Sequence, residues 1–421
     1  MNKPVIVAPG WSYEKAVIAS KYGAEEVYIW VPFTSLRMRQ NKVKDFDELK
    51  KTIQAIHDNG SKALLTMNIF PRNTDIKVFE SVVEQIADTN PDAIIFSDPG
   101  TFNVIRKYFP NTPLHLSTQT SSLNYESIKF RRDLGVKRIV LARELNIEEI
   151  KEIKEKVPDI ELEVFVHWAM CMSYSGRCLL WDYMAGRQAN KWECNHACRF
   201  KYKVWLEEER RPGKLFQLEN DKEWSYILSS KDLCTIDRLA EIMPYVDAIK
   251  IEWRSKSEFY VWAMVKAYKS VRDAIVEWRE PDLQAKELVE KIPHRPYWDG
   301  FLFNGLKDFP ETEEEKIDSD NNRVLSTNLD SPGPTFCRNY FGIFGDSFIE
   351  KDGKKYYEFT PKEILERWMK LKFLNVQWMW ELEIIDLLKE WWQELDRANC
   401  NTPKVFVLTD REIEGWEILY E

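Results

Sequence analysis

Eight short runs of apolar, mostly β-branched residues recur along the first 254 residues, and longer amphipathic stretches separate them. Short apolar runs that alternate with helix-like segments are typical of parallel βα units. Eight parallel strands with crossover helices close naturally into a (β/α)8 barrel. The sequence therefore predicts an α/β protein built on a TIM-like barrel. The eight runs occupy residues 5–9, 26–30, 63–69, 93–98, 114–118, 138–143, 162–168 and 248–254.

A doubly wound open sheet is the alternative fold. Such a sheet usually carries a glycine-rich phosphate-binding loop after its first strand, and the segment APGWS lacks that pattern. The segments KYGAEEVYI, DLGVKRIVLA and MPYVDAIKI each pass from a helix end through a turn into a strand, which is consistent with the barrel. Ser12 is placed to cap the first helix, and Gly60 to end the second.

The spacing of the runs also predicts the domain organisation. The stretch between the seventh and eighth runs is far longer than one helix requires, so we expect residues 169–230 to form an insertion at the carboxyl end of the seventh strand. Barrel enzymes carry their active sites at that end. We expect a barrel domain over residues 1–280, a proline-marked linker over 281–300 and a small α+β domain over 301–421.

The composition excludes some classes of protein. The 60 basic and 69 acidic residues give a formal net charge of −9, whereas a protein that coats nucleic acid must neutralise phosphates with Lys and Arg. No apolar run approaches the roughly 18 residues of a membrane span, and the first residues lack the pattern of a signal peptide. We expect a cytoplasmic protein that binds neither a membrane nor DNA, and the sequence leaves its oligomeric state open.

Four of the seven cysteines lie close together in the expected insertion, in the pattern Cys-x6-Cys, 15 residues, Cys-x3-Cys. These are Cys171, Cys178, Cys194 and Cys198, and Cys234 follows them. Four thiolates can hold zinc or an iron–sulfur cluster. The spacing differs from the paired Cys-x2-Cys of many structural zinc sites. Ordinary buried thiols are the alternative, because cysteine is often buried without any role.

The segments ELEVFVHWAMCMSYSGRCLL, GRQANKWECNHACRFKY, SSKDLC and IKIEWRSKSEFYV resemble the collagenase-like peptidase family, an unassigned peptidase family. Within it, the match is nearest to the bacterial tRNA 5-hydroxyuridine modification proteins. It covers roughly residues 4–300 and includes VPFTSLRMR, TMNIFPRN and FSDPG.

The resemblance implies a barrel that carries a 4Fe-4S cluster and hydroxylates the wobble uridine of a tRNA anticodon without oxygen, with prephenate as the linked oxygen donor. Other members hydroxylate a ribosomal RNA cytidine or the ubiquinone ring, and some were first described as collagenases. By motif, the implied ligands are Cys171, Cys178 and Cys194, with either Cys198 or Cys234 as the fourth. The implied partner is tRNA.

Several other polar residues fall at or beyond the carboxyl ends of expected strands, from which a barrel presents its chemistry. His167 is a candidate proton donor, and a packed histidine is the alternative. Four cationic side chains can bind a dicarboxylate such as prephenate or an RNA phosphate, and surface salt bridges are the alternative. The strand-end candidates are Asn68, Asp98, Gln119, Glu144 and Glu252, and the cationic candidates are Arg177, Arg199, Arg254 and Lys256.

For RNA binding, the segment RFKYKVWLEEERRPGK carries six basic and three acidic residues with interleaved aromatics. Aromatic rings can stack an unpaired base while cations hold its backbone, although an ordinary β-hairpin surface would have the same composition. For proteolysis, neither an HExxH nor a GxSxG motif is present.

Glycine is scarce, with 15 residues, while tryptophan is abundant, with 17. Tryptophan stands where members of the resembled family carry glycine, at Trp11, Trp30, Trp168, Trp192 and Trp253. Glycine at strand-to-loop turns often provides a positive φ or a close backbone approach. We therefore expect native glycine at many of these sites, encoded by UGA codons that the source translates as glycine. A genuine tryptophan-filled pocket is the alternative.

Overall fold

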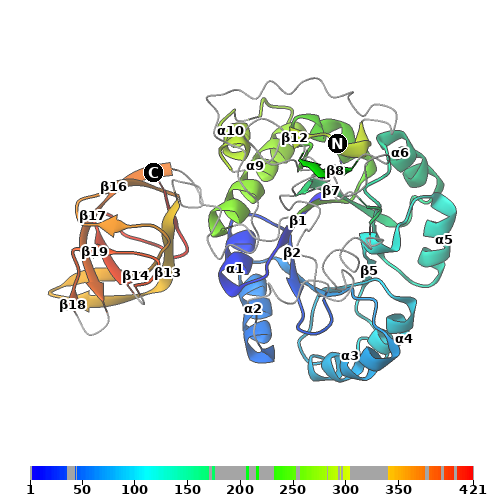
Figure 1. Ribbon diagram of the computed structural model, residues 1–421, viewed down its shortest axis with the longest axis horizontal. Coiled ribbons are helices and arrows are strands. Elements are labelled where there is room, and N and C mark those ends of the chain that lie inside the picture. The colour runs from blue at the N-terminus through cyan, green and yellow to red at the C-terminus, as the bar shows by residue number, and fades with distance from the viewer. Residues whose placement is uncertain are drawn as a thin grey trace.

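The computed structural model shows a closed barrel of eight parallel strands (Figure 1). Each strand pairs in parallel with its neighbour along the chain, and β11 closes the ring by pairing with both β7 and β1. All eight expected runs are strands, so the barrel is confirmed and the open sheet is not formed. The strands are β1 (Val5–Pro9), β2 (Glu26–Trp30), β3 (Lys62–Met67), β4 (Ala93–Phe96), β5 (Leu114–Leu116), β6 (Arg138–Val140), β7 (Glu161–Ala169) and β11 (Ala248–Ile251).

The structure describes most of the barrel and of the carboxyl-terminal unit. Its residues are 2–35, 43, 45–169, 173–175, 205–207, 215–217, 232–252, 257–281, 283–292, 294, 297–303, 340–374, 379–389, 393–402 and 405–420. Within the expected insertion, a short hairpin of β8 (Trp205–Glu207) and β9 (Leu215–Gln217) is described. Among the described residues, every helix is too short or too polar to cross a membrane.

Amphipathic helices cover the outside of the barrel and bury their apolar faces against the strands. Ser12 caps the first helix by accepting a hydrogen bond from the Lys15 backbone N–H at 3.3 Å. Gly60 ends the second with a φ of +77°, as the sequence predicts. The helices are α1 (Tyr13–Lys21), α2 (Phe46–Asp58), α3 (Asn73–Gln85), α4 (Pro99–Tyr108), α5 (Tyr125–Asp133), α6 (Ile147–Lys156), the one-turn α8 (Leu239–Ile242) and α9 (Glu258–Val276).

An ionic network fills the amino-terminal half of the barrel interior. Glu163 is fully buried on β7, where it lies 2.7 Å from Lys250 Nζ and 3.2 Å from Arg138 Nη1. Arg138 also contacts Glu26 at 3.0 Å and Glu161 at 2.8 Å. Burial alone would raise the pKa of Glu163, but Lys250 and Arg138 lower it below its ordinary value. Buried charges persist when they are paired in this way.

Two further strands extend the barrel sheet beyond β7. The strand β10 (Asp232–Cys234) runs antiparallel to the carboxyl end of β7, and β12 (Tyr297–Trp298) pairs with β10. The helix α10 (Leu283–Lys291) packs against α9. Residues 281–300 therefore contribute elements to the barrel unit and differ from the linker that we expected. Their prolines interrupt the helical pattern, yet buried residues such as Val289 and Ile292 hold the segment against the barrel.

The carboxyl-terminal residues form a second, antiparallel barrel (Figure 1). Its seven-stranded sheet has the order β16-β21-β13-β14-β20-β17-β18, and β16 also pairs with β17. The described residues of this part form strands without an α-helix, and residues 304–339 of the α+β domain that we expected lie outside the described residues. The strands are β13 (Tyr340–Lys351), β14 (Lys354–Pro361), β15 (Leu365–Glu366), β16 (Lys370–Leu374), β17 (Met379–Lys389), β18 (Gln393–Glu394), β19 (Arg397–Ala398), β20 (Val405–Thr409) and β21 (Ile418–Tyr420).

The second barrel contacts α1 and α9 of the first. The Tyr340 hydroxyl donates a hydrogen bond to Glu258 Oε2 at 3.2 Å, and Lys15 Nζ lies 3.8 Å from Glu258 Oε1. Lys21 Nζ donates to the backbone carbonyl of Gly415 at 2.6 Å. Because Lys15 and Glu258 are both almost completely buried, this junction includes a desolvated ion pair.

Candidate functional site

A histidine, a cysteine and a tyrosine meet where β7, β10 and α9 come together. The register of β10 places Cys234 opposite His167. The Tyr268 hydroxyl donates a hydrogen bond to the Val166 carbonyl at 2.8 Å and lies 3.3 Å from His167 Nδ1 and 3.8 Å from Cys234 Sγ. His167 is fully buried, and its ring also contacts Tyr260 and Tyr297. His167 is thus packed in the aromatic layer between the barrel wall and α9.

Burial raises the pKa of the Cys234 thiol to about 11. A cysteine nucleophile needs the opposite shift, because the thiolate is the reactive form. A metal ligand does not need it, since coordination itself deprotonates a thiol. The surroundings of Cys234 therefore disfavour a nucleophile, and they are compatible with either a metal ligand or an ordinary buried thiol.

A second group of contacts fixes Ser175, which lies between Cys171 and Cys178 in the chain. Glu144 Oε1 accepts a hydrogen bond from the Ser175 backbone N–H at 2.9 Å. Arg143 Nε donates to Ser175 Oγ at 3.0 Å, and Ser121 Oγ donates to the Ser175 carbonyl at 2.9 Å. Since Arg143 and Glu144 lie a few residues after β6, these bonds hold Ser175 at the carboxyl end of the barrel.

Asn68 and Gln119 belong to a polar strip across the carboxyl ends of β3, β4 and β5. Asn68 Nδ2 lies 3.5 Å from Ser117 Oγ, and Ser97 Oγ donates a hydrogen bond to Gln119 Oε1 at 2.8 Å. Gln119 is buried and Asn68 half-buried. Asp98, another strand-end candidate, accepts hydrogen bonds from the Gly100 and Thr101 N–H groups as the N-cap of α4. Its carboxylate is therefore engaged in capping.

Glu252 connects the end of β11 to the aromatic layer around His167. Its backbone N–H donates to the His167 carbonyl at 3.0 Å, and its own carbonyl lies 3.5 Å from the Tyr260 hydroxyl. The residue is buried. His167 and Glu252 are thus neighbours, whereas Asn68 and Gln119 form a separate group.

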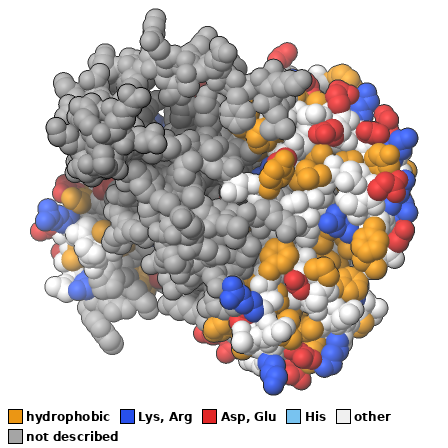
Figure 2. All heavy atoms as spheres, turned by 45° about the vertical axis from the view of Figure 1, so that its right-hand side comes forward, with side chains coloured by type: hydrophobic (Ala, Val, Ile, Leu, Met, Phe, Trp, Pro, Cys, Tyr) orange, Lys and Arg blue, Asp and Glu red, His pale blue; other side chains and the backbone are white. Residues whose placement is uncertain are grey.

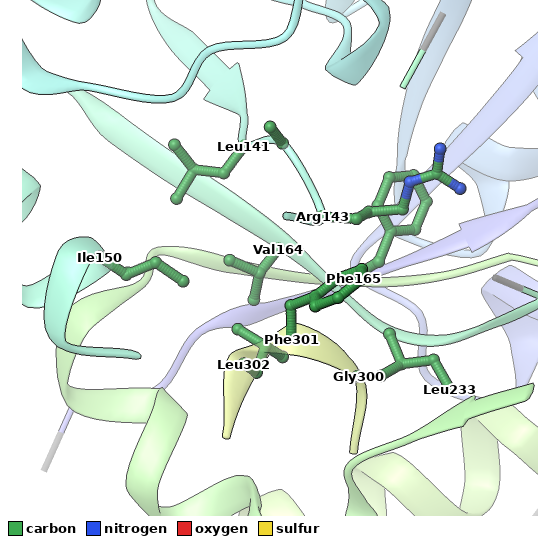
Figure 3. A pocket seen from close by; sticks show the side chains of 10 residues that line it. Leu141, Arg143, Ile150, Val164, Phe165, Leu233, Gly300, Phe301 and Leu302 are labelled. Carbon is green, nitrogen blue, oxygen red and sulfur yellow. The ribbon is translucent and has the colours of Figure 1, made fainter. Parts of the chain in front are cut away.

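A small, mostly apolar pocket lies between the residues that follow β6, the middle of β7 and β10, and the turn at residues 300–302 (Figure 3). Leu141, Ile150 and Val164 form its aliphatic side, and Arg143 extends its guanidinium away from them (Figure 3). The other lining residues are Ala142, Phe165, Leu233 and the 3₁₀ turn η7 (Gly300–Leu302). The pocket shares Arg143 with the Ser175 anchor, so it borders the cysteine-bearing segment.

Trp11 and Trp30 stack on each other inside the barrel, with ring centroids 5.7 Å apart and an angle of 16° between the planes. They are 3% and 5% exposed and share an interior cluster with Tyr28 and Leu64. Lys15 Nζ lies 4.7 Å from the Trp11 ring centroid. The two indoles therefore occupy interior space just beyond the carboxyl ends of β1 and β2.

Several predicted site residues lie outside the described residues: Cys171, Cys178, Cys194, Cys198, Arg177, Arg199, Arg254, Lys256, Trp192 and Trp253. Trp168 is described in its backbone, which pairs with Leu233. Of the five cysteines considered as ligands, Cys234 is the one within the described residues, and it lies beside the strand that precedes Cys171 in the sequence. The assignment of the ligands stays a prediction.

The sequence did not single out three of the residues that organise this region. Tyr268 lies within the long apolar face of α9, where nothing in the pattern distinguishes a site residue from a core residue. Ser175 lies in the motif SYSGRC, where its position between two cysteines was the only available signal. Arg143 was likewise not singled out.

The outer face of the barrel around α3, α4 and α5 carries mixed charges. Figure 2 shows basic and acidic side chains interspersed among hydrophobic ones on the coloured part of this face. Many are paired, as in Lys107–Glu80 at 2.7 Å, Lys129–Glu126 at 2.9 Å and Arg132–Asp159 at 3.1 Å. A face with alternating signs offers little attraction to a phosphate backbone.

Comparison with known proteins gives consistent family matches. The sequence model of peptidase family U32 matches residues 11–309. The tRNA hydroxylation protein P of Escherichia coli is 34% identical over 340 residues, which cover 72% of this chain and 75% of that protein. The 23S rRNA 5-hydroxycytidine C2501 synthase of the same organism is 30% identical, over 82% of this chain and 54% of that protein. A collagenase of Porphyromonas gingivalis is 31% identical, over 72% of this chain and 74% of that protein.

Proposed function

The chain belongs to peptidase family U32, and from this premise we propose that it is an enzyme that hydroxylates RNA. The proposed reaction converts the wobble uridine of a tRNA anticodon to 5-hydroxyuridine, independently of oxygen, with a 4Fe-4S cluster and with prephenate as the oxygen donor. One observation supports the proposal: Cys234 pairs with His167 near the end of β7, and Ser175, which lies between Cys171 and Cys178 in the sequence, is bonded to Glu144 beyond the carboxyl end of β6. The names of the tRNA- and rRNA-modifying relatives support the substrate class.

In this proposal Cys171, Cys178 and Cys194 hold the cluster together with Cys198 or Cys234. A bound cluster supplies electron transfer or an iron site for the oxygen donor. Glu144 and Arg143 hold Ser175, which lies between the first two of these cysteines in the sequence, and their proposed role is to help position those ligands. A misplacement of those ligands by about 1 Å would reduce ligation as well as activity.

The polar strip of Asn68 and Gln119 is suited to the uracil ring, because amides both donate and accept hydrogen bonds. The carboxylates of prephenate would pair with the cationic candidates Arg177, Arg199 and Arg254. The RNA backbone would follow the insertion, whose segment 199–214 has six basic and three acidic residues, whereas the face in Figure 2 has mixed signs. The cytoplasmic location stays a prediction.

The test compares tRNA nucleosides from a deletion strain with those from strains complemented by the native gene or by its Cys171→Ala variant. We expect 5-hydroxyuridine to disappear on deletion and to return only with the native gene. If the nucleoside is unchanged in the deletion strain, the proposal fails. The same comparison, extended to ribosomal RNA and to quinone intermediates, identifies those substrates if tRNA is not the target.

Anaerobic purification gives an independent reading of the cofactor. We expect iron and sulfide in the protein together with visible absorbance, and we expect both to fall in the Cys234→Ser variant if Cys234 is the fourth ligand. A colourless, zinc-bound protein would contradict the cluster.

A peptidase is the alternative function, which the name of the Porphyromonas relative suggests. A peptidase would still cleave peptides when Cys171 is replaced by Ala. The raised pKa of the Cys234 thiol disfavours Cys234 as the nucleophile of a peptidase.

A further inference from the structure

Three tryptophans adopt a backbone conformation that side chains rarely take. Their φ angles are +57° at Trp278, +68° at Trp368 and +62° at Trp416. A positive φ occurs in only a few per cent of residues other than glycine, mostly in Asn and Asp. Ten tryptophans have a described backbone, so three is far above that expectation. The described tyrosines, which are similarly bulky, all have negative φ.

Trp278 occupies the position that glycine fills at the ends of other helices in the same protein. After α1, α2 and α5, the residue in the left-handed conformation is Gly23, Gly60 or Gly135. In each case its N–H bonds to the carbonyl three residues back, and the next N–H bonds to the carbonyl five residues back. Trp278 and its successor repeat both hydrogen bonds at the end of α9, to Ile275 at 3.3 Å and Ala274 at 3.0 Å. This Schellman ending favours glycine because a Cβ is strained there.

At two of the three tryptophans, Trp278 and Trp368, packing of the indole ring does little to offset this strain. Trp278 is 83% exposed and Trp368 is 66% exposed, so little apolar area is buried by either ring. The backbone of Trp368, in contrast, is firmly held, because its N–H bonds to the Ile384 carbonyl. Trp416 directly follows Gly415, which also has a positive φ, of +89°. At Trp278 and Trp368 the fold needs the backbone conformation and gains little from the side chain, whereas the Trp416 ring is partly buried and contacts Tyr13.

We propose that the protein in its native source carries glycine at positions 278, 368 and 416, where this chain has tryptophan. The physical route is a UGA codon that the source translates as glycine. The proposal rests on backbone geometry in the described residues and involves other positions than the five suspected from the sequence. It also explains why a chain with 15 glycines has 17 tryptophans.

The same codon assignment at Trp11 and Trp30 would change the barrel interior. The stacked indoles fill the space beside Lys15 near the carboxyl ends of β1 and β2. With glycine at both positions that space becomes a cavity, open to a ligand at the end of the barrel where substrates bind. This consequence rests on the proposed function, whereas the assignments at 278, 368 and 416 do not.

Peptide mass spectrometry of the protein isolated from its source tests the proposal directly. Trypsin releases residue 278 in the peptide 273–279 and residue 416 in the peptide 412–421. We expect both peptides at the mass with glycine. Tryptophan in both peptides would overturn the proposal, irrespective of whether the protein modifies RNA. A glycine-bearing protein without hydroxylase activity would instead count against the proposed function alone.

A stability series on the recombinant chain separates conformational strain from side-chain loss. We expect Trp278→Gly to raise the ratio of folded to unfolded protein by about 5-fold, because the strain of a left-handed residue is removed. Trp278→Ala keeps the Cβ and should stay within about 2-fold of the parent. Trp298→Gly, at a strand position where the ring contacts Phe301, should lower the ratio. If Trp278→Gly is no more stable than Trp278→Ala, the strain argument fails.

Discussion

Replacing Glu163 by Gln removes the negative charge that two buried cations share inside the barrel. Glu163 is fully buried, with Lys250 Nζ at 2.7 Å and Arg138 Nη1 at 3.2 Å. Breaking a buried ion pair by neutralising one partner typically costs about 3–5 kcal/mol, because the remaining charge is left uncompensated. Arg138 keeps Glu26 and Glu161 as partners, so the cost arises mainly at Lys250. We expect Glu163→Gln to lower the free energy of unfolding of the barrel by about 3–5 kcal/mol.

Glu161→Gln is the matched control, since Glu161 lies on the same strand and contacts the same arginine but its side chain is 32% exposed. Solvent screens that contact, and we expect a loss of at most about 1 kcal/mol. Adding Lys250→Met to Glu163→Gln removes the stranded ammonium and should restore part of the stability. The measurement is a guanidinium titration followed by circular dichroism. Equal losses for the two single variants would refute the reasoning.

The pH dependence of the stability of Glu163→Gln gives a second test of the buried ion pairs. The pKa of Glu163 is lower in the folded protein than in the unfolded chain. A carboxyl group with a depressed folded pKa stabilises the protein above its unfolded pKa, and the contribution is lost as the pH falls through the folded pKa. The difference in the free energy of unfolding between the native chain and Glu163→Gln should therefore be largest near pH 7. It should shrink below about pH 4, near the ordinary glutamate pKa.

Three further predictions concern the anchor, the junction and the second barrel. Glu144→Gln weakens the hydrogen bond to the Ser175 N–H, so iron content after anaerobic purification should fall while the circular dichroism spectrum is retained; unchanged iron would contradict the anchoring role. Glu258→Gln removes the buried carboxylate that contacts both Lys15 and Tyr340 and should raise the rate of proteolysis between the two barrels, whereas equal cleavage rates would count against a stabilising junction. Burial raises the pKa of Glu417 to about 7, so stability should decline as the pH rises from about 4.3 to 7, and Glu417→Gln should flatten that decline in thermal unfolding.

The barrel could be predicted from the sequence because its strands are continuous β-branched runs, which a strand buried on both faces requires. The strands β10 and β12 could not, because three and two residues carry no periodic signal. In the second barrel, segments such as ELEIIDLLK in β17 are rich in Leu, Glu and Lys, which favour helices locally, yet pairing with β16 and β20 makes them strands.

Some residues of the candidate site can likewise be predicted from the sequence, and others cannot. The cysteines can be recognised from their spacing in the sequence alone. His167, Asn68 and Gln119 can be chosen as candidates because they lie at the predicted ends of strands. Asp98 has the same kind of place but serves as a helix cap, a role that its sequence, aspartate before proline, also favours. The contact of Tyr268 with both His167 and Cys234 depends on how α9 packs across the sheet, which local sequence does not encode.

The pairing of β10 with the end of β7 has a consequence for how the insertion can evolve. Residues 169 and 232 are partners in that pairing, so the segment between them leaves and re-enters the barrel at one point. The entropy of closing such a loop grows only with the logarithm of its length, about 0.6 kcal/mol for each doubling. Its length and sequence can therefore diverge among related chains at small cost to the barrel, and recognition of new substrates can arise by exchange of this one loop.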